Sequence, residues 1–201
     1  RPFDEVLIKS MQETTKYLCE HIQGCVLGYT QSDEITLILV DYKYLDSSAW
    51  FDYEIQKLCS ISASMATMAF NKFFADEVDK WYDTALDEIE KGTLDWNMVN
   101  NQLEKYKKAF NAGAMFDSRC FNIPKEEVCN LIYWRQLDAT RNSIQMVGQA
   151  NFSHAELQGK SCNDIQDMLM EQKNINWNNT PTPWKRGTAW RKDFGLDFNM
   201  P

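Results

Sequence analysis

The first forty residues change from a helical to a strand-like hydrophobic pattern. Apolar residues recur at steps of three and four over residues 3–22, which predicts an amphipathic helix. Two short runs rich in aliphatic and β-branched residues follow at 25–30 and 35–41, as is typical of paired strands. The polar residues between these runs predict a hairpin turn with two adjacent carboxylates, Asp33 and Glu34, at its tip.

Helical periodicity resumes after the hairpin and dominates the middle of the chain. An N-cap cluster at 46–48 predicts a long helix that runs to about Phe73. Residues 76–110 hold two more helical patterns on either side of a Gly-Thr break. One face of these patterns is charged, so we expect residues 76–112 to form a peripheral helical insertion in a single domain that spans residues 1–201.

The second half of the chain combines strand-like and helical patterns. Residues 114–121 predict a strand, and Pro124, followed by acidic residues, predicts the start of a helix that runs to about Ala150. A capping box with a short helix, a further helix, an Asn- and Pro-rich loop and a last strand are then predicted at 153–159, 161–172, 174–183 and 184–192. This order of elements fits an α/β (α+β) fold in which helices back an antiparallel sheet.

The composition indicates an ordinary globular protein of a reducing compartment. Apolar residues make up 44% of the chain and charged residues 25%, and no apolar run approaches the length of a membrane span. The six cysteines form no CxxC pair and share no spacing with the two histidines, which argues against a zinc site. We therefore expect the cysteines to be small buried hydrophobic residues and the protein to be cytoplasmic.

The net charge of −8 is distributed unevenly along the chain. Residues 1–110 carry 11 basic and 19 acidic side chains, whereas residues 111–201 carry 10 of each. An acidic total argues against non-specific binding of nucleic acid, because such binding requires neutralisation of phosphates. A local basic surface in the neutral second half stays compatible with these numbers.

Asp33 and Glu34 are candidates for catalysis and for a magnesium site. Mg²⁺ prefers oxygen ligands and usually binds one or two carboxylates together with substrate phosphates. Neighbouring residues of a strand point to opposite faces, so two-metal chemistry here needs a bulge or a carboxylate from another strand. Asp117 is the one acid in another clear predicted strand. A polar β-turn that binds no metal is the alternative interpretation of Ser32-Asp33-Glu34.

A polar stripe on the helix after Pro124 is a second candidate. Its members recur at steps of three and four along one face: Arg135, Asp138, Asn142, Gln145 and Gln149. A face that is merely solvated would be richer in Lys and Glu, which favour helices. Asn, Gln and Arg are better suited to hydrogen bonds with sugars, bases or phosphates. A solvated or inter-helix polar face is the open alternative.

Basic residues near the C-terminus are a third candidate. Lys185 and Arg186 precede a glycine, which allows cationic side chains and backbone to approach a phosphate, and Lys160 would add to the same surface. A charge pair that only improves solubility is the alternative. His21 and His154 lie at predicted helix ends, where we expect a structural role.

Seven short motifs occur in a fixed order along the chain. They are GYTQSDE at 28–34, FDSR at 116–119, WRQ at 134–136 with Asp138, RNS at 141–143, LQGK at 157–160, INWN at 175–178 and KRG at 185–187. This series resembles that of the tRNA(His) guanylyltransferase family, the 3′-to-5′ reverse polymerases. The matches cover nearly the whole chain apart from residues 76–112. An ordered set of motifs is far more specific than any one of them.

The resemblance implies a polymerase-palm-like domain that adds nucleotides to the 5′ end of tRNA. The family activates a 5′-monophosphate end with ATP or GTP, and the 3′-hydroxyl of the incoming nucleotide then attacks that end. Two Mg²⁺ ions serve this chemistry. Family members assemble as homotetramers, so the resemblance also implies an oligomer.

By position, the resemblance assigns roles to ten residues. The catalytic metal ligands would be Asp33 and Glu34. The nucleotide-binding residues would be Ser32, Asn142, Ser143 and Lys160. The RNA-binding residues would be Arg135, Arg141, Lys185 and Arg186.

Two departures from the family pattern refine these expectations. Residues 140–143 read TRNS, where the guanylyltransferases proper carry HINN, and this version resembles the "like protein" branch, which repairs truncated tRNAs under template direction. The family's first metal motif, an Asp-Gly-Arg strand, would precede Arg1, and we expect the missing carboxylate to belong to it. A non-catalytic nucleotide- or RNA-binding member of the same fold is therefore the alternative to an enzyme. The coding sequence upstream of Arg1 would discriminate between the two.

Overall fold

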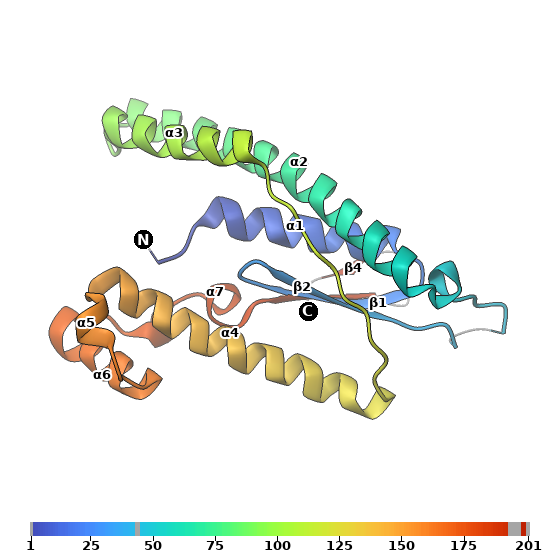
Figure 1. Ribbon diagram of the computed structural model, residues 1–201. Helices are drawn as coiled ribbons and strands as arrows, with labels where there is room; N and C mark the ends of the chain where they lie inside the picture. Colours follow the sequence, from blue (N-terminus) through green and yellow to red (C-terminus); the bar gives the residue numbers. More distant parts are fainter. Residues whose placement is uncertain (1, 43–44, 193–197, 200–201) are drawn as a thin grey trace.

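A four-stranded antiparallel sheet lies at the centre of the computed structural model, which describes residues 2–42, 45–192 and 198–199 (Figure 1). The strands are β1 (Cys25–Gln31), β2 (Glu34–Leu39), β3 (Thr188–Lys192) and β4 (Phe198–Asn199), in the order β2-β1-β3-β4. β1 pairs with β2 through the predicted hairpin and with β3 on its other side. The predicted antiparallel sheet backed by helices is confirmed.

Helix α1 (Glu5–His21) packs directly against the sheet. Three hydroxyl side chains on its buried face each donate a hydrogen bond to the carbonyl four residues earlier: Ser10, Thr14 and Thr15. These groups need no partner outside the helix, so they can be buried without cost to the sheet. The closest approach is at Gly28 of β1, where a Cβ would lie 2.2 Å from the Cys19 Sγ.

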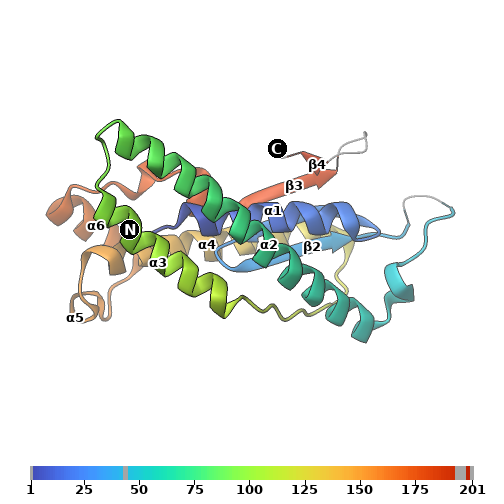
Figure 2. The same cartoon turned by 90° about the horizontal axis from the view of Figure 1, so that it is seen from above.

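Helices α2 (Ile55–Glu90) and α3 (Trp96–Ala112) form an outer layer over α1 (Figures 1 and 2). The predicted interruption between residues 73 and 76 is wrong, because α2 contains neither Gly nor Pro and continues for 36 residues. The predicted start at 46–48 is also wrong. A 3₁₀ turn, η1 (Trp50–Tyr53), precedes α2 instead. None of the described helices combines the length and apolar character needed to span a bilayer.

Residues 113–124, which we call the strap, cross from α3 to the opposite face of the sheet (Figure 1). The predicted strand at 114–121 is wrong, since none of these residues, all of which the structure describes, pairs with a strand. The strap is extended, but α2 satisfies its backbone. The Asn71 side chain bonds both the amide and the carbonyl of Ala114, and the Thr67 hydroxyl accepts from the Phe116 amide at 3.0 Å.

The strap leads into the helices that lie on the other face of the sheet. Pro124 precedes a 3₁₀ turn, η2 (Lys125–Glu127), and α4 (Val128–Asn151), as predicted. Capping boxes then open α5 (His154–Leu157) and α6 (Cys162–Lys173). The predicted loop at 174–183 contains η3 (Trp177–Asn179), and the predicted strand at 184–192 is half helix: α7 (Thr182–Arg186) precedes β3.

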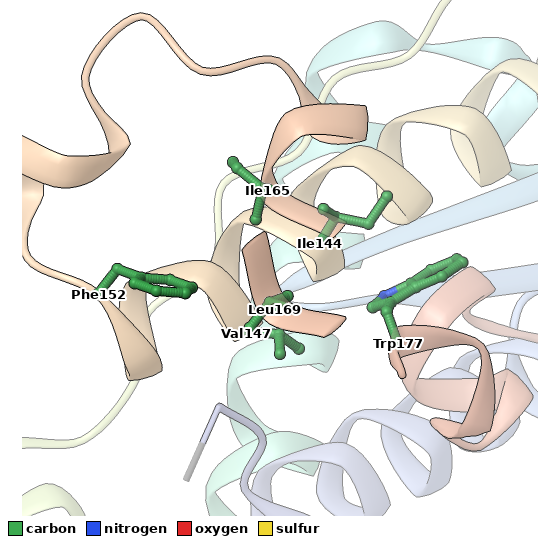
Figure 3. Close-up of a cluster of buried hydrophobic side chains, with 6 residues drawn as sticks. All are labelled: Ile144, Val147, Phe152, Ile165, Leu169 and Trp177. Carbon is green, nitrogen blue, oxygen red and sulfur yellow. The ribbon is translucent and has the colours of Figure 1, made fainter. Parts of the chain in front are cut away.

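Buried side chains form three clusters, one toward each end of α1 and one beneath α4. α1 contributes to the first two, which pack it against the sheet and against α2 and α3. The third cluster joins α4 to α6 and η3, and Figure 3 shows its members: Ile144, Val147, Phe152, Ile165, Leu169 and Trp177. This third cluster fixes the distance of α6 and η3 from α4, and α4 in turn contacts β1 of the sheet.

The prediction that all six cysteines are buried is wrong for most of them. Cys19 and Cys25 are each 2% exposed and contribute to the core. Cys120 and Cys129 are exposed, whereas Cys59 and Cys162 are half-buried. The physical reason is that Cys120 lies in the exposed stretch 119–122 of the strap, which has no strand partner, and Cys129 lies on the solvent side of the first turn of α4.

Gly187 determines how closely the α7–β3 turn approaches β1. Its backbone (φ 77°, ψ −173°) lies in a region that is essentially reserved for glycine, and a Cβ there would lie 2.4 Å from the Thr30 carbonyl oxygen. We predict that Gly187→Ala lowers the free energy of unfolding by about 3–5 kcal/mol, because strain and a backbone clash add. Urea denaturation followed by circular dichroism measures this.

Gly113→Ala is the matched control. Gly113 has a similar backbone conformation (φ 67°, ψ 158°), but its Cβ would make only an ordinary contact, 3.6 Å from the Asn71 Oδ1. We expect a loss of about 1–3 kcal/mol, the cost of strain alone. Equal losses in the two variants would contradict the importance of the contact at Gly187.

Candidate active site

The turn of the β1–β2 hairpin presents two acids at the edge of the sheet. Ser32 has a left-handed φ of 51°, Asp33 completes the turn, and Glu34 is the first residue of β2. All three are exposed. The Thr30 hydroxyl donates to the Glu34 carbonyl at 2.9 Å and so closes the turn from inside. Because Asp33 lies in the turn, the alternation of a regular strand does not set its direction relative to Glu34.

Two side chains hold the Glu34 carboxylate, and both bind the same oxygen. The Arg135 guanidinium, from α4, forms an ion pair with Oε2 of Glu34, and the Gln31 Nε2 donates to that oxygen at 2.7 Å. The Arg135 side chain is 17% exposed and that of Glu34 50%, so the pair is shielded on the arginine side. These bonds orient the carboxylate through Oε2 and make no use of Oε1.

The polar stripe of α4 divides into two parts. Asp138 accepts hydrogen bonds from Arg141 at 2.7 Å and from Asn142 at 3.3 Å, and it lies close enough to Tyr29 of β1 to affect the pKa of that phenol. Arg135, Asp138 and Asn142 are half-buried, whereas the last two members of the stripe, Gln145 and Gln149, are exposed. The first part therefore faces the hairpin, and the second faces solvent.

Tyr29 anchors the Lys-Arg-Gly motif beneath the hairpin. Its side chain is 1% exposed, and its hydroxyl donates to the Arg186 carbonyl at 2.6 Å. Burial raises the pKa of Tyr29 to about 12, and the nearby Arg135 opposes this shift only in part. The phenol therefore stays protonated at neutral pH and keeps its donor. The Arg186 side chain is exposed, so its charge is free to face a ligand.

Ser143 and Lys185 are engaged in contacts that join α4, η3 and α7. The Ser143 hydroxyl accepts from the Trp177 Nε1 at 3.1 Å, and its side chain is 3% exposed. Lys185 donates to the Asn178 carbonyl at 2.7 Å, and its Nζ lies 5.0 Å from the centre of the Trp177 ring. Ser143 has a packing role in this arrangement. A nucleotide would reach its hydroxyl only if Trp177 moved.

Lys160 is not brought to the hairpin by any contact in the described residues. It is exposed in the loop between α5 and α6, which form one end of the molecule (Figure 1). Two hollows of about 240 and 440 Å³ lie along residues 174–184, on the side of α6 and of the chain start. Their linings contain none of the ten predicted site residues. The hairpin acids instead lie on an open surface.

The first part of the chain matches a family model over residues 1–124, and that model is described as Thg1, tRNAHis guanylyltransferase. The chain belongs to the tRNA(His) guanylyltransferase family. The match covers α1, the hairpin, α2, α3 and the strap. The resemblance predicted from the ordered motifs is therefore confirmed.

Solved structures of the family share this architecture. A bacterial Thg1-like protein in complex with ATP is 39% identical, with a TM-score of 0.79, and the alignment covers all of this chain and 74% of that one. A bacterial Thg1-like protein in complex with GTP is 34% identical, with a TM-score of 0.68, and is covered over 70% of its length. An uncharacterized protein of Acanthamoeba polyphaga mimivirus is 28% identical over 96% of this chain.

The chain is shorter than its relatives. It spans 63% of the mimivirus protein and 58% of the next curated relatives that it matches. Among the described residues, no group of three or more His, Cys, Asp or Glu side chains is placed to hold a metal ion. Asp33 and Glu34 nevertheless have the hard oxygen donors that Mg²⁺ prefers, and Oε1 of Glu34 is not used by Arg135 or Gln31. These two carboxylates fit a magnesium site in which the protein supplies one or two carboxylates and the substrate phosphates supply further ligands.

The residues that connect the hairpin to the rest of the site could not be identified from the sequence. Gln31 and Tyr29 lie in a motif that was recognised for its acids, and no sequence signal distinguishes a carboxylate-holding glutamine from a solvated one. The pairing of Arg135 with Glu34 joins residues a hundred positions apart. The sequence shows an acid at a predicted turn and an arginine on a helical stripe, but it does not show that the two side chains meet.

We predict that Ser143→Ala affects folding rather than nucleotide affinity. The substitution leaves the buried Trp177 Nε1 without an acceptor, so we expect a loss of about 1–3 kcal/mol in the free energy of unfolding. The dissociation constant for GTP, measured by calorimetry, should change less than about twofold, which is under 0.5 kcal/mol. Asn142→Ala, on the half-buried face beside Asp138, is the matched variant. Weaker GTP binding by Ser143→Ala with unchanged stability would restore the nucleotide-binding role.

Proposed function

We propose that the protein is a Mg²⁺-dependent nucleotidyltransferase that extends the 5′ end of tRNA in the 3′–5′ direction. Membership of the tRNA(His) guanylyltransferase family supports the reaction class. One observation carries the assignment of the site: the Glu34 carboxylate is held through a single oxygen by Arg135 and Gln31, beside the exposed Asp33. An acid that is oriented in this way and keeps an oxygen open is suited to bind an ion rather than to solvate a turn.

Asp33 and Glu34 are the residues that we propose to hold the two Mg²⁺ ions, together with substrate phosphates. When bound, the ions would stabilise charge on the phosphates and on the attacking 3′-hydroxyl. The protein contributes a preorganised carboxylate, because Glu34 does not have to be ordered when the substrate arrives. Ser32, in its left-handed turn, exposes its hydroxyl on the same tip and is proposed to contact the nucleotide phosphates.

ATP and GTP are the proposed nucleotide substrates, by analogy with the bacterial Thg1-like proteins whose complexes contain them. Asn142 lies on the hairpin-facing part of the α4 stripe and is proposed to bind the nucleotide. Lys160 keeps its proposed role in nucleotide binding only if the nucleotide extends toward the α5–α6 loop. The side chains of Arg141 and Arg186 are exposed around the hairpin, and we propose that they bind tRNA phosphates.

We propose that Lys185 supports the tRNA-binding surface of the protein through its contacts with η3. Its ammonium is hydrogen-bonded to the Asn178 carbonyl and lies over Trp177, so part of its charge is already engaged.

The expected homotetramer and cytoplasmic location stay predictions. Several large apolar side chains on the strap and the first half of α4 are exposed and would gain from being covered by another copy: Met115, Phe121, Tyr133, Trp134 and Leu137.

A non-catalytic nucleotide- or RNA-binding protein is the second candidate. The observation that favours it is the lack of a third acid near Asp33 and Glu34 in the described part of the chain. Two-metal chemistry normally uses carboxylates from more than one strand. This candidate keeps nucleotide and tRNA binding but has no transfer activity.

We predict that Asp33→Ala lowers incorporation of labelled GTP at the 5′ end of a truncated tRNA by at least about a hundredfold, since loss of a metal-binding carboxylate removes several kcal/mol of transition-state stabilisation. The control is Asp83→Ala, an exposed acid of α2 in the outer layer. Wild-type-like activity of Asp33→Ala would refute the site. GTP binding without any incorporation by the unaltered protein would establish the non-catalytic candidate instead.

A second prediction separates two roles of Arg135. Because its guanidinium is 17% exposed and ion-paired with Glu34, we propose that it positions this carboxylate rather than binds RNA. Arg135→Ala should lower the turnover number by about 10–100-fold, the usual effect of losing a residue that orients a metal-binding carboxylate, and leave the tRNA dissociation constant within about twofold.

Arg186→Ala supplies the comparison. Its exposed charge should contribute to phosphate neutralisation, so we expect weaker tRNA binding and a salt dependence reduced by about one counterion. A reduced salt slope for Arg135→Ala with unchanged turnover would return Arg135 to RNA binding.

A further inference from the structure

The strap and α2 are held in register by a series of side-chain contacts. Successive inward positions of the strap, every second residue, meet successive turns of α2 in reverse order. Ala114 contacts Asn71, Phe116 contacts Thr67, and the Ser118 hydroxyl lies 2.8 Å from that of Ser62. Cys120 and Cys59 continue the series, with their Sγ atoms 3.7 Å apart.

The spacing of the two elements explains why the series does not drift. From residue 114 to 120 an extended chain advances about 20 Å, at about 3.3 Å a residue. From residue 71 to 59 an α-helix advances about 18 Å, at 1.5 Å a residue. The two lengths nearly match, so the contacts made by Ala114, Phe116 and Ser118 place Cys120 opposite Cys59. Their proximity is a consequence of this register rather than of one rotamer.

We propose that Cys59 and Cys120 form a reversible disulfide when the protein meets a hydroperoxide, and that this bond fastens the strap to α2. Cys59 is half-buried and Cys120 is exposed, so a small oxidant can reach the pair. A disulfide needs an S–S distance of about 2.05 Å. The required movement is less than about 2 Å, and it falls at the end of the series, two residues beyond the hydrogen bond of Ser118.

The chemistry uses two thiols and one peroxide. The thiolate of one cysteine attacks a peroxide oxygen, which gives a sulfenic acid and releases hydroxide. The sulfur of the second thiol then displaces the sulfenic oxygen, the S–S bond forms, and water leaves. In sum, two thiols are oxidised and hydrogen peroxide is reduced to two waters.

The other cysteines differ from this pair in access or in geometry. Cys19 and Cys25 contact each other, but both are 2% exposed within the core. Cys162 is half-buried and its thiol faces the Arg141 carbonyl. Cys129 is exposed on the first turn of α4 and serves as an internal control for accessibility. Oxidation is therefore expected to select the Cys59–Cys120 pair.

The bond would close a loop that contains most of α2, all of α3 and the first part of the strap. Cross-linking a long loop restricts the unfolded chain, so the oxidised protein should melt at a higher temperature, by about 5–15 °C for a chain of this length. The strap leads directly into α4, which carries Arg135. The cross-link would form whether or not the protein has the proposed enzyme activity.

Treatment of the folded protein with hydrogen peroxide, alkylation of the remaining thiols and peptide mass spectrometry test the proposal. We expect one dominant cross-linked peptide pair, Cys59–Cys120, that dithiothreitol reverses, and a melting temperature that rises with the cross-linked fraction. Cys59→Ser and Cys120→Ser should each abolish the cross-link and the rise. Cys129→Ser should leave both unchanged.

Thr67→Val tests the role of the register, because it removes the acceptor for the Phe116 amide in the middle of the series. We expect it to slow cross-linking several-fold while the protein stays folded. Recovery of Cys59 and Cys120 as separate thiols or sulfinic acids after peroxide treatment would overturn the proposal. So would a dominant disulfide between any other two cysteines.

Discussion

The close approach of the α7–β3 turn to β1 is the constraint on which the lower half of the molecule depends. Gly187 leaves room for the Thr30 carbonyl, and the Tyr29 hydroxyl binds the Arg186 carbonyl. These contacts join the second strand-forming region of the chain to the first, although more than 150 residues separate them. β3 can then pair with β1, and α7 is held against α4. The side chains of α4 are thereby brought under the hairpin turn.

The same frame gives the hairpin acids their surroundings. Arg135 reaches Glu34 because α4 lies along the face of the sheet opposite α1 (Figure 1). Gln31 binds the same carboxylate from its own strand, and Tyr29 lies beneath. The Glu34 carboxylate is therefore oriented from within the hairpin by Gln31 and from α4 by Arg135. Orientation before substrate binding is the contribution that a protein can make to phosphoryl chemistry without a deep pocket.

The two faces of the sheet differ in how they are secured. Above the sheet, α1 is packed by buried side chains along its length, and its buried hydroxyls are hydrogen-bonded within the helix. The strap connects this upper layer to α4 and is held by polar side chains of α2 rather than by a strand ladder. The position of the strap is therefore set by side chains of a helix and not by pairing with a neighbouring strand.

The sequence by itself determined the local elements and the family. Periodicity located α1, the hairpin, α4 and α6, because spacing of apolar residues and capping boxes act over a few positions. The order of motifs identified the tRNA(His) guanylyltransferase family, which the model match over residues 1–124 then showed. The strap looked like a strand, since an extended segment has the same alternation whether its partner is a strand or a helix.

Only the tertiary structure decided which polar residues share a site. It placed Arg135 on Glu34, committed Ser143 to Trp177, left Lys160 apart from the hairpin, and brought Cys120 to Cys59. No short sequence pattern indicates any of these contacts or the separation of Lys160. Each depends on the distance between two elements, and that distance is set by the packing of side chains such as the α4–α6 cluster of Figure 3. Local patterns report what a segment can form, whereas long-range packing decides what its side chains meet.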